Sequence, residues 1–229
     1  MSKHIGIVAC SAEGAALCYR TVCDEAPALM GRHMHPEITM HTHCLGDYME
    51  FIRRYDWEGV AELMLSSANK LATAGADFLI SPDNTIHHAF DVVAARSPLP
   101  WLHIVDEVAA EAKSRGFHKL AITGTKYTTE GTVYQTKLPA AGFDYLVPGA
   151  DERAQIDRII MDELVNGIFT DESRTYFQQV IGRLSHEGCD AVVLGCTEIP
   201  LLIDEITSPL PTLDSTRILA RAALRHALQ

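Results

Sequence analysis

The chain has 229 residues, of which 47% are hydrophobic and 21% charged, a composition typical of one large or two smaller globular domains. The formal net charge of -11 argues against nucleic acid as a partner, because proteins that bind phosphate backbones present a basic face. No apolar run approaches the roughly 18 residues of a membrane span and the N-terminus has no signal-peptide pattern, so we expect a cytoplasmic protein without a membrane partner. The six cysteines are irregularly spaced and form no C-x-x-C pair, which predicts reduced thiols.

Short apolar runs alternate with amphipathic stretches from one end of the chain to the other. This alternation predicts an α/β fold whose strands form mainly parallel sheets. The expected strands cover residues 4–9, 37–42, 77–81, 100–105, 119–123, 144–147, 191–194 and 211–213. The expected helices include one that follows the turn at residues 10–14 and runs to about residue 26, those at residues 57–74, 108–115, 151–166 and 171–186, and a final helix after residue 213.

The chain contains an internal repeat. Residues 75–83 align with residues 188–196 at a constant offset of 113, and a long amphipathic helix precedes both copies. The repeat predicts two similar, pseudo-symmetric α/β domains, each with a mainly parallel four-stranded sheet flanked by helices.

The repeat also suggests domain boundaries and a place for the active site. We expect residues 1–100 with 210–229 to form the N-terminal half and residues 101–209 the C-terminal half. If the halves face each other, Asp83 and Cys196 lie on opposite walls of a cleft between them. Two proton-handling groups on opposite faces of a carbon suit inversion of that carbon.

Cys196 follows the buried run 191–194, at the carboxyl end of a strand, where open α/β sheets bind ligands. A lone cysteine there is more often a small buried residue, but the repeat favours catalysis because titratable groups end both copies. A thiol with an ordinary pKa of about 8.5 needs activation. A helix starting near Glu198 would favour the thiolate, whereas the Glu198 carboxylate opposes it unless it faces another group.

Polar side chains at the strand-to-helix turns are candidates for holding a substrate carboxylate. The same residue types cap helices, so both interpretations stay open. His87 either tunes the site or is structural. Arg53 and Arg54 either supply a cation for a substrate side chain or form a solvated helix face. The candidate substrate-binding residues are Ser11, Asn84, Thr85, Thr125, Thr128, Thr197 and Glu198.

Two histidine pairs at i, i+2 spacing resemble metal ligands, because each pair lies on one face of an extended segment. They are His33 with His35 and His41 with His43. A predicted strand separates the pairs by some 20 Å if it is fully extended. We therefore expect no metal site.

Two segments resemble the signatures of the aspartate/glutamate racemase superfamily, namely residues 195–202 (GCTEIPLL) and 83–87 (DNTIH). The likeness covers nearly the whole chain and is closest to the aspartate racemase branch and its broad-specificity amino-acid racemase relatives. The resemblance implies an isomerase that uses no cofactor, acts on a small amino-acid or carboxylic-acid substrate and is often a homodimer. It also implies two similar α/β domains with the active site between them.

In this superfamily two cysteines flank the substrate α-carbon, and one removes a proton while the other delivers one from the opposite face. Cys196 matches the second cysteine. Asp83 occupies the place of the first, which departs from the family pattern, although some relatives carry threonine there. The catalytic pair implied by the resemblance is thus Asp83 and Cys196.

Asp83 leaves three interpretations open, because an ordinary aspartate is more acidic than a cysteine by about 4.6 pKa units. In the first, Asp83 and Cys196 are an asymmetric acid/base pair of an amino-acid racemase or epimerase. In the second, Cys196 alone moves the proton in a decarboxylase, isomerase or lyase, and Asp83 binds the substrate ammonium. In the third, the protein only binds a small carboxylate.

Overall fold

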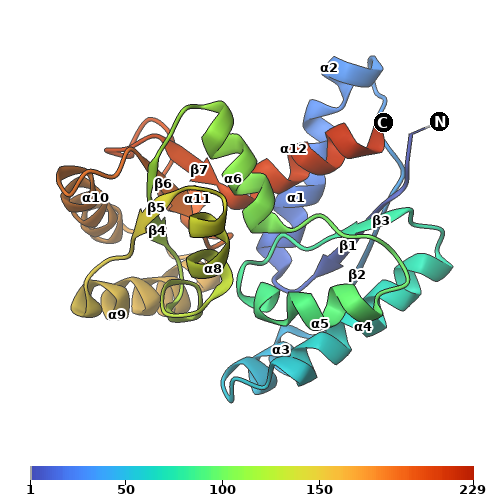
Figure 1. Cartoon of the computed structure of the whole chain (residues 1–229), viewed down its shortest axis with the longest axis horizontal. Helices are drawn as coiled ribbons and strands as arrows, with labels where there is room; N and C mark the ends of the chain where they lie inside the picture. Colours follow the sequence, from blue (N-terminus) through green and yellow to red (C-terminus); the bar gives the residue numbers. More distant parts are fainter. Residues whose placement is uncertain (1) are drawn as a thin grey trace. The chain divides into compact units, whose positions relative to one another are not determined.

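The computed structural model describes residues 2–229 (Figure 1). They divide into two compact units, here called the first and the second unit. The first unit contains the described residues up to Glu107 together with Thr216–Gln229, and the second is Val108–Ser215. Among the helices of residues 2–229, none is both long and apolar enough to cross a membrane.

The first unit is built on a parallel three-stranded sheet with β1 (Ile5–Ala9) in the centre. β2 (Ile38–Thr42) and β3 (Phe78–Ile80) pair with β1 on either side, and all five β1 residues are buried. Helices on its faces explain why β1 is a continuous apolar run. The helices of this unit are α1 (Ala12–Glu25), α2 (Pro27–Met30), α3 (Leu45–Ile52), α4 (Trp57–Thr73), the 3-10 helix η1 (Thr85–Ala89) and α5 (Phe90–Arg96).

The predicted fourth strand of this sheet, residues 100–105, is wrong. Only Trp101 forms a bridge, parallel to Leu79, and α6 (Ile104–Ser114) begins three residues later. Pro100 has no N–H to donate to a ladder, which shortens any strand that it starts. The His103 imidazole then accepts a hydrogen bond from the Val105 N–H at 3.1 Å, and this bond starts the helix instead.

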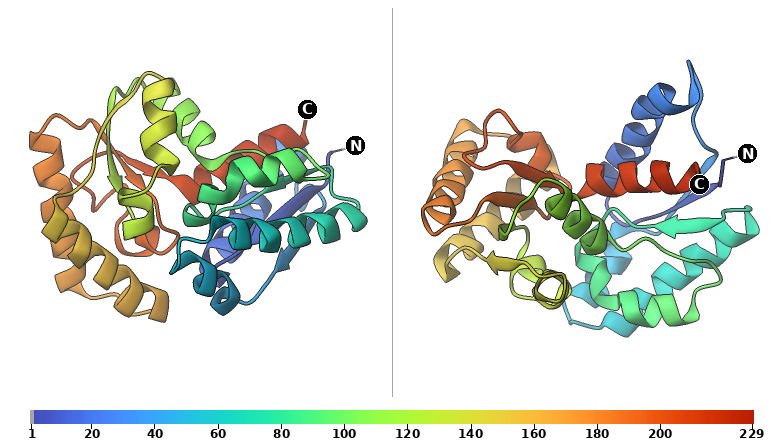
Figure 2. Two further views of the ribbon diagram at one scale, coloured as in Figure 1. Left: turned by 60° about the horizontal axis from the view of Figure 1, so that its bottom comes forward. Right: turned by 45° about the horizontal axis from the view of Figure 1, so that its top comes forward.

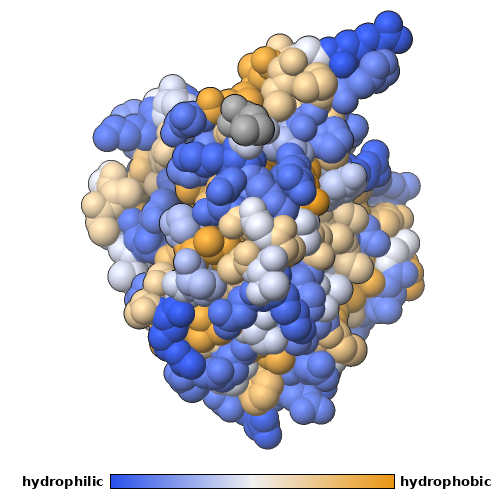
Figure 3. Space-filling model, turned by 90° about the vertical axis from the view of Figure 1, so that its right-hand side faces the viewer, coloured by the Kyte–Doolittle hydropathy of each residue, from blue (hydrophilic) through white to orange (hydrophobic). Residues whose placement is uncertain are grey.

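The ends of the chain lie together in the first unit. α12 (Ser215–Ala227) runs beside α1, as the views of Figure 2 show. The Arg221 guanidinium donates to both carboxylate oxygens of Glu25 on α1, and the Lys3 N–H donates to the Ala227 carbonyl at 2.8 Å. On the face shown in Figure 3, hydrophilic side chains predominate and apolar ones are scattered among them.

The second unit contains a parallel four-stranded sheet in the order β5-β4-β6-β7. The prediction places residues 210–229 in the N-terminal half. Residues 212–214 instead form a strand of the second unit, where they pair with β6. The strands are β4 (Lys119–Thr123), β5 (Asp144–Leu146), β6 (Ala191–Leu194) and β7 (Thr212–Asp214). The helices are α7 (Lys126–Thr129), α8 (Val133–Ala140), α9 (Ala150–Arg158), a π-helical turn (Ile159–Glu163), a 3-10 turn (Leu164–Asn166), α10 (Asp171–His186) and α11 (Ile199–Leu202).

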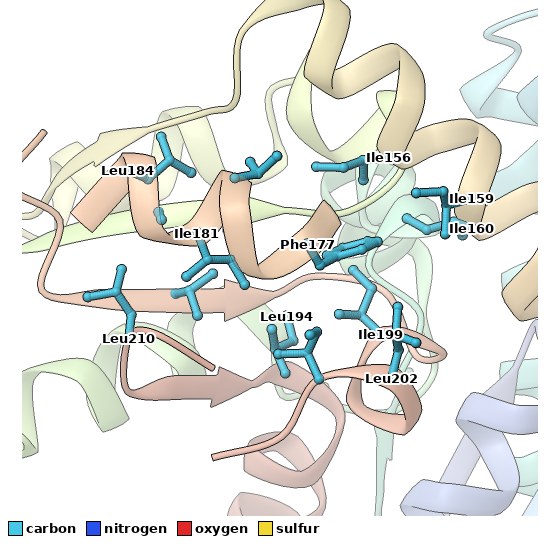
Figure 4. Packing of buried hydrophobic residues seen from close by; sticks show 14 of the residues in the cluster. Ile156, Ile159, Ile160, Phe177, Ile181, Leu184, Leu194, Ile199, Leu202 and Leu210 are labelled. Carbon is cyan, nitrogen blue, oxygen red and sulfur yellow. The ribbon is translucent and has the colours of Figure 1, made fainter. Parts of the chain in front are cut away.

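One cluster of buried hydrophobic residues packs between α10 and β6 (Figure 4). Phe177, Ile181 and Leu184 lie on one face of α10 at helical spacing, and all are fully buried. Full burial of each such side chain contributes about 1.5–3 kcal/mol relative to exposure. The Thr170 hydroxyl caps α10 by accepting from the Ser173 N–H, which confirms the predicted start of this helix. The residues of β6 that lead to its carboxyl end are therefore packed on one side against α10.

Candidate functional site

In the second unit, two glycines allow the ends of β4 and β6 to meet. The Gly195 N–H donates to the Thr123 carbonyl at 2.9 Å. A Cβ at Gly195 would lie 2.6 Å from that carbonyl oxygen, and one at Gly124 would lie 2.9 Å from the Gly195 oxygen. Gly124 also has a φ of +157°, which side chains rarely adopt. This close contact fixes the backbone immediately before Cys196.

Cys196 is half-buried and faces an acidic side chain. Its Sγ donates a hydrogen bond to Oε2 of Glu198 at 2.9 Å, and the Thr197 hydroxyl donates to the same oxygen at 2.7 Å. Glu198 is only 4% exposed, so both contacts lie in a protected environment. A carboxylate accepts and does not donate, so Glu198 is placed to take the thiol proton. The sequence pattern groups Glu198 with the substrate-binding residues and does not reveal this contact.

The helix expected near Glu198 is confirmed as α11, a single turn that begins at Ile199. The Ile199 N–H donates to the Cys196 carbonyl at 3.3 Å. One turn gives a small dipole, so the Glu198 contact is the stronger influence on the thiol.

Thr125 and Thr128 lie on the neighbouring turn after β4, and both are buried. The Thr128 hydroxyl reaches the Gly195 carbonyl at 3.5 Å, a weak contact to the same turn as Cys196. The Thr125 side chain makes no capping hydrogen bond to α7. Helix capping therefore does not account for Thr125.

In the first unit, the turns after β1 and β3 hold the other predicted residues. The Ser11 hydroxyl accepts from the Gly14 N–H at 3.3 Å and so caps α1. Oδ1 of Asp83 accepts from the Thr85 N–H at 3.0 Å and from the Ile86 N–H at 3.4 Å. Asp83 is half-buried, and its carboxylate accepts from N–H groups in the first turn of η1. Two backbone donors stabilise its ionised form.

Asn84 and Thr85 follow Asp83 at the start of η1. Asn84 is 3% exposed, and its side chain makes no capping hydrogen bond to the helix. Thr85 is half-buried. Both remain candidates for contacting a substrate.

His87 has structural partners on both ring nitrogens. Nδ1 donates to the Asp83 carbonyl at 2.8 Å, and Nε2 accepts from the Ile104 N–H at 3.4 Å. Its ring also stacks on Phe90 with an interplanar angle of 7°. These contacts support the structural interpretation, in which His87 holds the Asp83 turn against the start of α6.

Arg53 and Arg54 are exposed at the end of α3, which supports their assignment to a solvated face. Tyr48, on the same helix, is fully buried and was not singled out from the sequence. Burial raises the pKa of the Tyr48 phenol, and the charges of Cys10 and Asp83 raise it further. An aromatic residue in an amphipathic segment reads as core, so no sequence signal marks Tyr48 as part of this region.

Two of the four histidines singled out from the sequence, His41 and His43, contact α4. Within residues 2–229, no group of three or more histidine, cysteine or acidic side chains is arranged to hold a metal ion. His41 and His43 instead contact the α4 hydroxyls of Ser67 and Ser66, at 2.9 and 3.1 Å.

The chain matches one family model and several relatives over most of its length. The model of the Asp/Glu/Hydantoin racemase family matches residues 5–223. The broad-specificity amino-acid racemase RacX of Bacillus subtilis (strain 168) is 25% identical over 172 residues, which are 75% of this chain and 74% of RacX.

Solved structures of similar proteins match the fold of this chain over nearly its full length. The crystal structure of a candidate Asp/Glu racemase from Yersinia pestis has a TM-score of 0.91 and 32% identity, and the match covers 99% of this chain and 100% of that one. An aspartate racemase homologue from Pyrococcus horikoshii OT3 has a TM-score of 0.87 and 28% identity, with both chains covered completely.

The chain therefore belongs to the Asp/Glu/Hydantoin racemase family. This membership makes it an isomerase of the racemase class, and it confirms both the predicted resemblance and the α/β fold class.

Proposed function

We propose that the protein is an amino-acid racemase that works without a cofactor and uses Cys196 as a proton-transfer group. The observation that supports it most is the hydrogen bond from the Cys196 thiol to the buried Glu198 carboxylate. A thiolate is the reactive form of cysteine, and a neighbouring base supplies it at neutral pH. The strand-end position of Cys196, on a turn fixed by two glycines, suits a group that must meet a carbon atom accurately.

Asp83 is the group that we assign to the opposite face of the α-carbon. It follows β3 in the repeat copy that matches the Cys196 copy, and it is half-buried. In this assignment the Cys196 thiolate takes the proton from one enantiomer and protonated Asp83 returns one from the other side. The roles are reversed for the other enantiomer.

The substrate that we propose is a small α-amino acid. RacX is described as a broad-specificity amino-acid racemase, and an aspartate racemase homologue is among the similar structures. Hydroxyl and amide groups at the turns after β3 and β4, among them Asn84 and Thr125, would hold the substrate carboxylate. We further propose that the enzyme is a cytoplasmic homodimer.

One observation favours a second candidate, in which Cys196 acts alone. The Thr85 and Ile86 N–H groups stabilise the Asp83 anion, which makes it a weaker base and a rarer acid at neutral pH. Asp83 would then bind the substrate ammonium, and the reaction would be a decarboxylation, isomerisation or elimination at one face.

Deuterium exchange at Cα in heavy water separates these candidates. Both enantiomers of each common amino acid are incubated with the wild type, Cys196→Ala and Asp83→Asn, and label and chirality are measured together. A racemase incorporates deuterium from both enantiomers with inversion and loses inversion in both variants. Exchange from one enantiomer without inversion would support the one-base enzyme. Exchange no faster than without protein would leave only a binding protein.

A further inference from the structure

Buried hydroxyl groups hold the strand that leads to Cys196 from both sides. The Thr123 hydroxyl donates to the Val193 carbonyl at 2.8 Å, and the Ser215 hydroxyl donates to the Leu194 carbonyl at 2.9 Å. Thr123 is the last residue of β4 and Ser215 directly follows β7, and these are the two strands that flank β6. The last two carbonyls of β6 are therefore held by donors from opposite neighbours.

The sheet itself does not require either hydroxyl. Thr123 and Ser215 are both 0% exposed. Buried parallel strands are normally continuous apolar runs, and β6 follows this rule. A buried hydroxyl has to be hydrogen-bonded to offset the loss of its contacts with water, and a carbonyl oxygen has two lone pairs with which to accept. The two hydroxyls thus fix the end of β6 in addition to the backbone ladder.

The contacts continue as far as the residue before Cys196. The Gly195 N–H donates to the Thr123 carbonyl at 2.9 Å, so Thr123 holds Val193 through its hydroxyl and Gly195 through its backbone. The Thr128 hydroxyl adds a weaker contact to the Gly195 carbonyl at 3.5 Å. A Cβ at Gly195 would lie 3.1 Å from Cγ2 of Thr128, which shows how closely the two residues pack. The backbone that carries Cys196 is therefore fixed from both sides of β6.

The thiol depends on this accuracy because its contact with Glu198 is short and directional. Sγ of Cys196 lies 2.9 Å from Oε2 of Glu198, and a hydrogen bond weakens steeply as it bends. Misplacement of a reacting group by about 1 Å can lower a rate by about 10²-fold. A shift of the peptide before Cys196 would move the sulfur relative to Glu198 and to a substrate carbon alike.

We propose that Thr123 and Ser215 are positioning residues for the Cys196 thiol. Each acts through the backbone of β6 and not by contact with the substrate. This inference rests on the proposed function, in which Cys196 exchanges a proton with the substrate α-carbon. No sequence signal marks either residue, because threonine is common in strands and serine is common at the start of helices.

Infrared spectroscopy tests the positioning without activity. The S–H stretching band of Cys196 is assigned from the difference between the wild type and Cys196→Ala, and its frequency falls as the thiol hydrogen bond strengthens. Thr123→Val keeps the shape of the side chain, and Ser215→Ala removes only the oxygen. In both variants the band should move to higher frequency, because the thiol is no longer aligned with the Glu198 carboxylate. An unchanged band in the folded variants would overturn the proposal, and either variant suffices if the other does not fold.

Thr123→Ser separates the hydroxyl from the volume of the side chain. It keeps the donor and removes a methyl group, so the band should stay where it is in the wild type. A role of Thr123 in packing alone predicts that Thr123→Ser shifts the band as much as Thr123→Val does, and that result would overturn the proposal.

The kinetics of deuterium exchange at Cα separate positioning from substrate binding. Loss of either hydroxyl should lower kcat by about tenfold and change KM by less than about twofold, because the groups that bind substrate stay in place.

Thr21→Val is the matched control. It removes another buried hydroxyl that donates to a carbonyl, that of Leu17 at 2.8 Å, on α1 of the first unit. It should leave both the band and kcat unchanged. An equal loss of kcat in Thr21→Val and Thr123→Val would show a general effect of lost stability and would overturn the proposal.

The two measurements keep this inference apart from the proposed function. A shifted band in the variants of a protein whose wild type shows no exchange would support the positioning and reject the proposed function. A loss of activity with an unchanged band would overturn the positioning, whatever reaction the enzyme performs.

Discussion

The carboxyl end of β6 presents a thiol to a hydrogen-bond acceptor, whereas the carboxyl end of β3 presents a carboxylate to hydrogen-bond donors. The Cys196 thiol donates to the Glu198 carboxylate, which is placed to take the proton when the thiol reacts. The Thr85 and Ile86 N–H groups hold Asp83 as an anion. The two contacts act in opposite directions at rest, because a carboxylate that accepts from a thiol favours the protonated form of Cys196, whereas backbone donors favour the ionised form of Asp83.

This comparison shows how two unlike groups can serve as a pair. A thiol is the weaker acid by about 4.6 pKa units and needs a base to ionise. A carboxylate needs no such help, but it needs a source of protons when it must act as an acid. Cys196 and Asp83, at equivalent strand ends of the two units, therefore need different groups around them. Substitutions at these positions separate what each group contributes to activity.

The largest effect is expected at Cys196. Cys196→Ala removes the thiol that donates to Glu198, so both exchange and inversion at Cα should fall by about 10²–10⁴-fold or more. Steady-state racemisation measured by chiral chromatography checks this. Cys189→Ala is the control, since that thiol is buried in the same unit and should leave activity intact. Retained exchange in Cys196→Ala would remove the thiol from the mechanism.

Glu198→Gln tests the acceptor side of the comparison. The amide keeps the shape of the side chain and cannot take a proton, so activity at neutral pH should fall by about 10–100-fold. Activity should then rise with pH toward the ordinary thiol pKa of about 8.5, because the thiol must ionise unaided. A full pH–rate profile checks this. Thr197→Val keeps the carboxylate and should not change the shape of the profile, and an unchanged profile in Glu198→Gln would contradict the assignment.

Asp83→Asn tests the donor side. An asparagine still accepts from the Thr85 N–H, so stability should change little, while inversion should fall by about tenfold or more and exchange by Cys196 should persist. Asp83→Ala loses the cap as well and should lower the free energy of unfolding by about 1 kcal/mol. Thermal unfolding of both variants separates capping from chemistry. Full inversion in Asp83→Asn would remove Asp83 from the proton transfer.

The smallest effect is on stability. Gly195→Ala places a Cβ 2.6 Å from the Thr123 carbonyl and should lower the free energy of unfolding by about 1–3 kcal/mol. Gly182→Ala, where the Cβ has open space on α10, should be neutral or stabilising by up to about 1 kcal/mol. Urea denaturation checks both. An unchanged midpoint for Gly195→Ala would show that the glycine contact does not hold the Cys196 turn.

Local rules predicted most of the fold because they act over short spans. The apolar run at residues 191–194 is β6, and α10 spans the predicted residues 171–186, as expected from periodicity. The strand expected at residues 100–105 failed because Pro100 withholds a donor and the His103 side chain starts α6 early. The sequence pattern contains both residues but does not say which tendency prevails.

The sequence by itself determined the repeat, the strand ends and the family resemblance, because these depend on the order and spacing of residue types. Only the tertiary structure decided which groups face each other. The Cys196 thiol donates to the Glu198 carboxylate, the Ser11 hydroxyl caps α1, and the Tyr48 hydroxyl is buried. Those contacts depend on turn geometry and on packing between segments far apart in the chain, and residue spacing does not fix either.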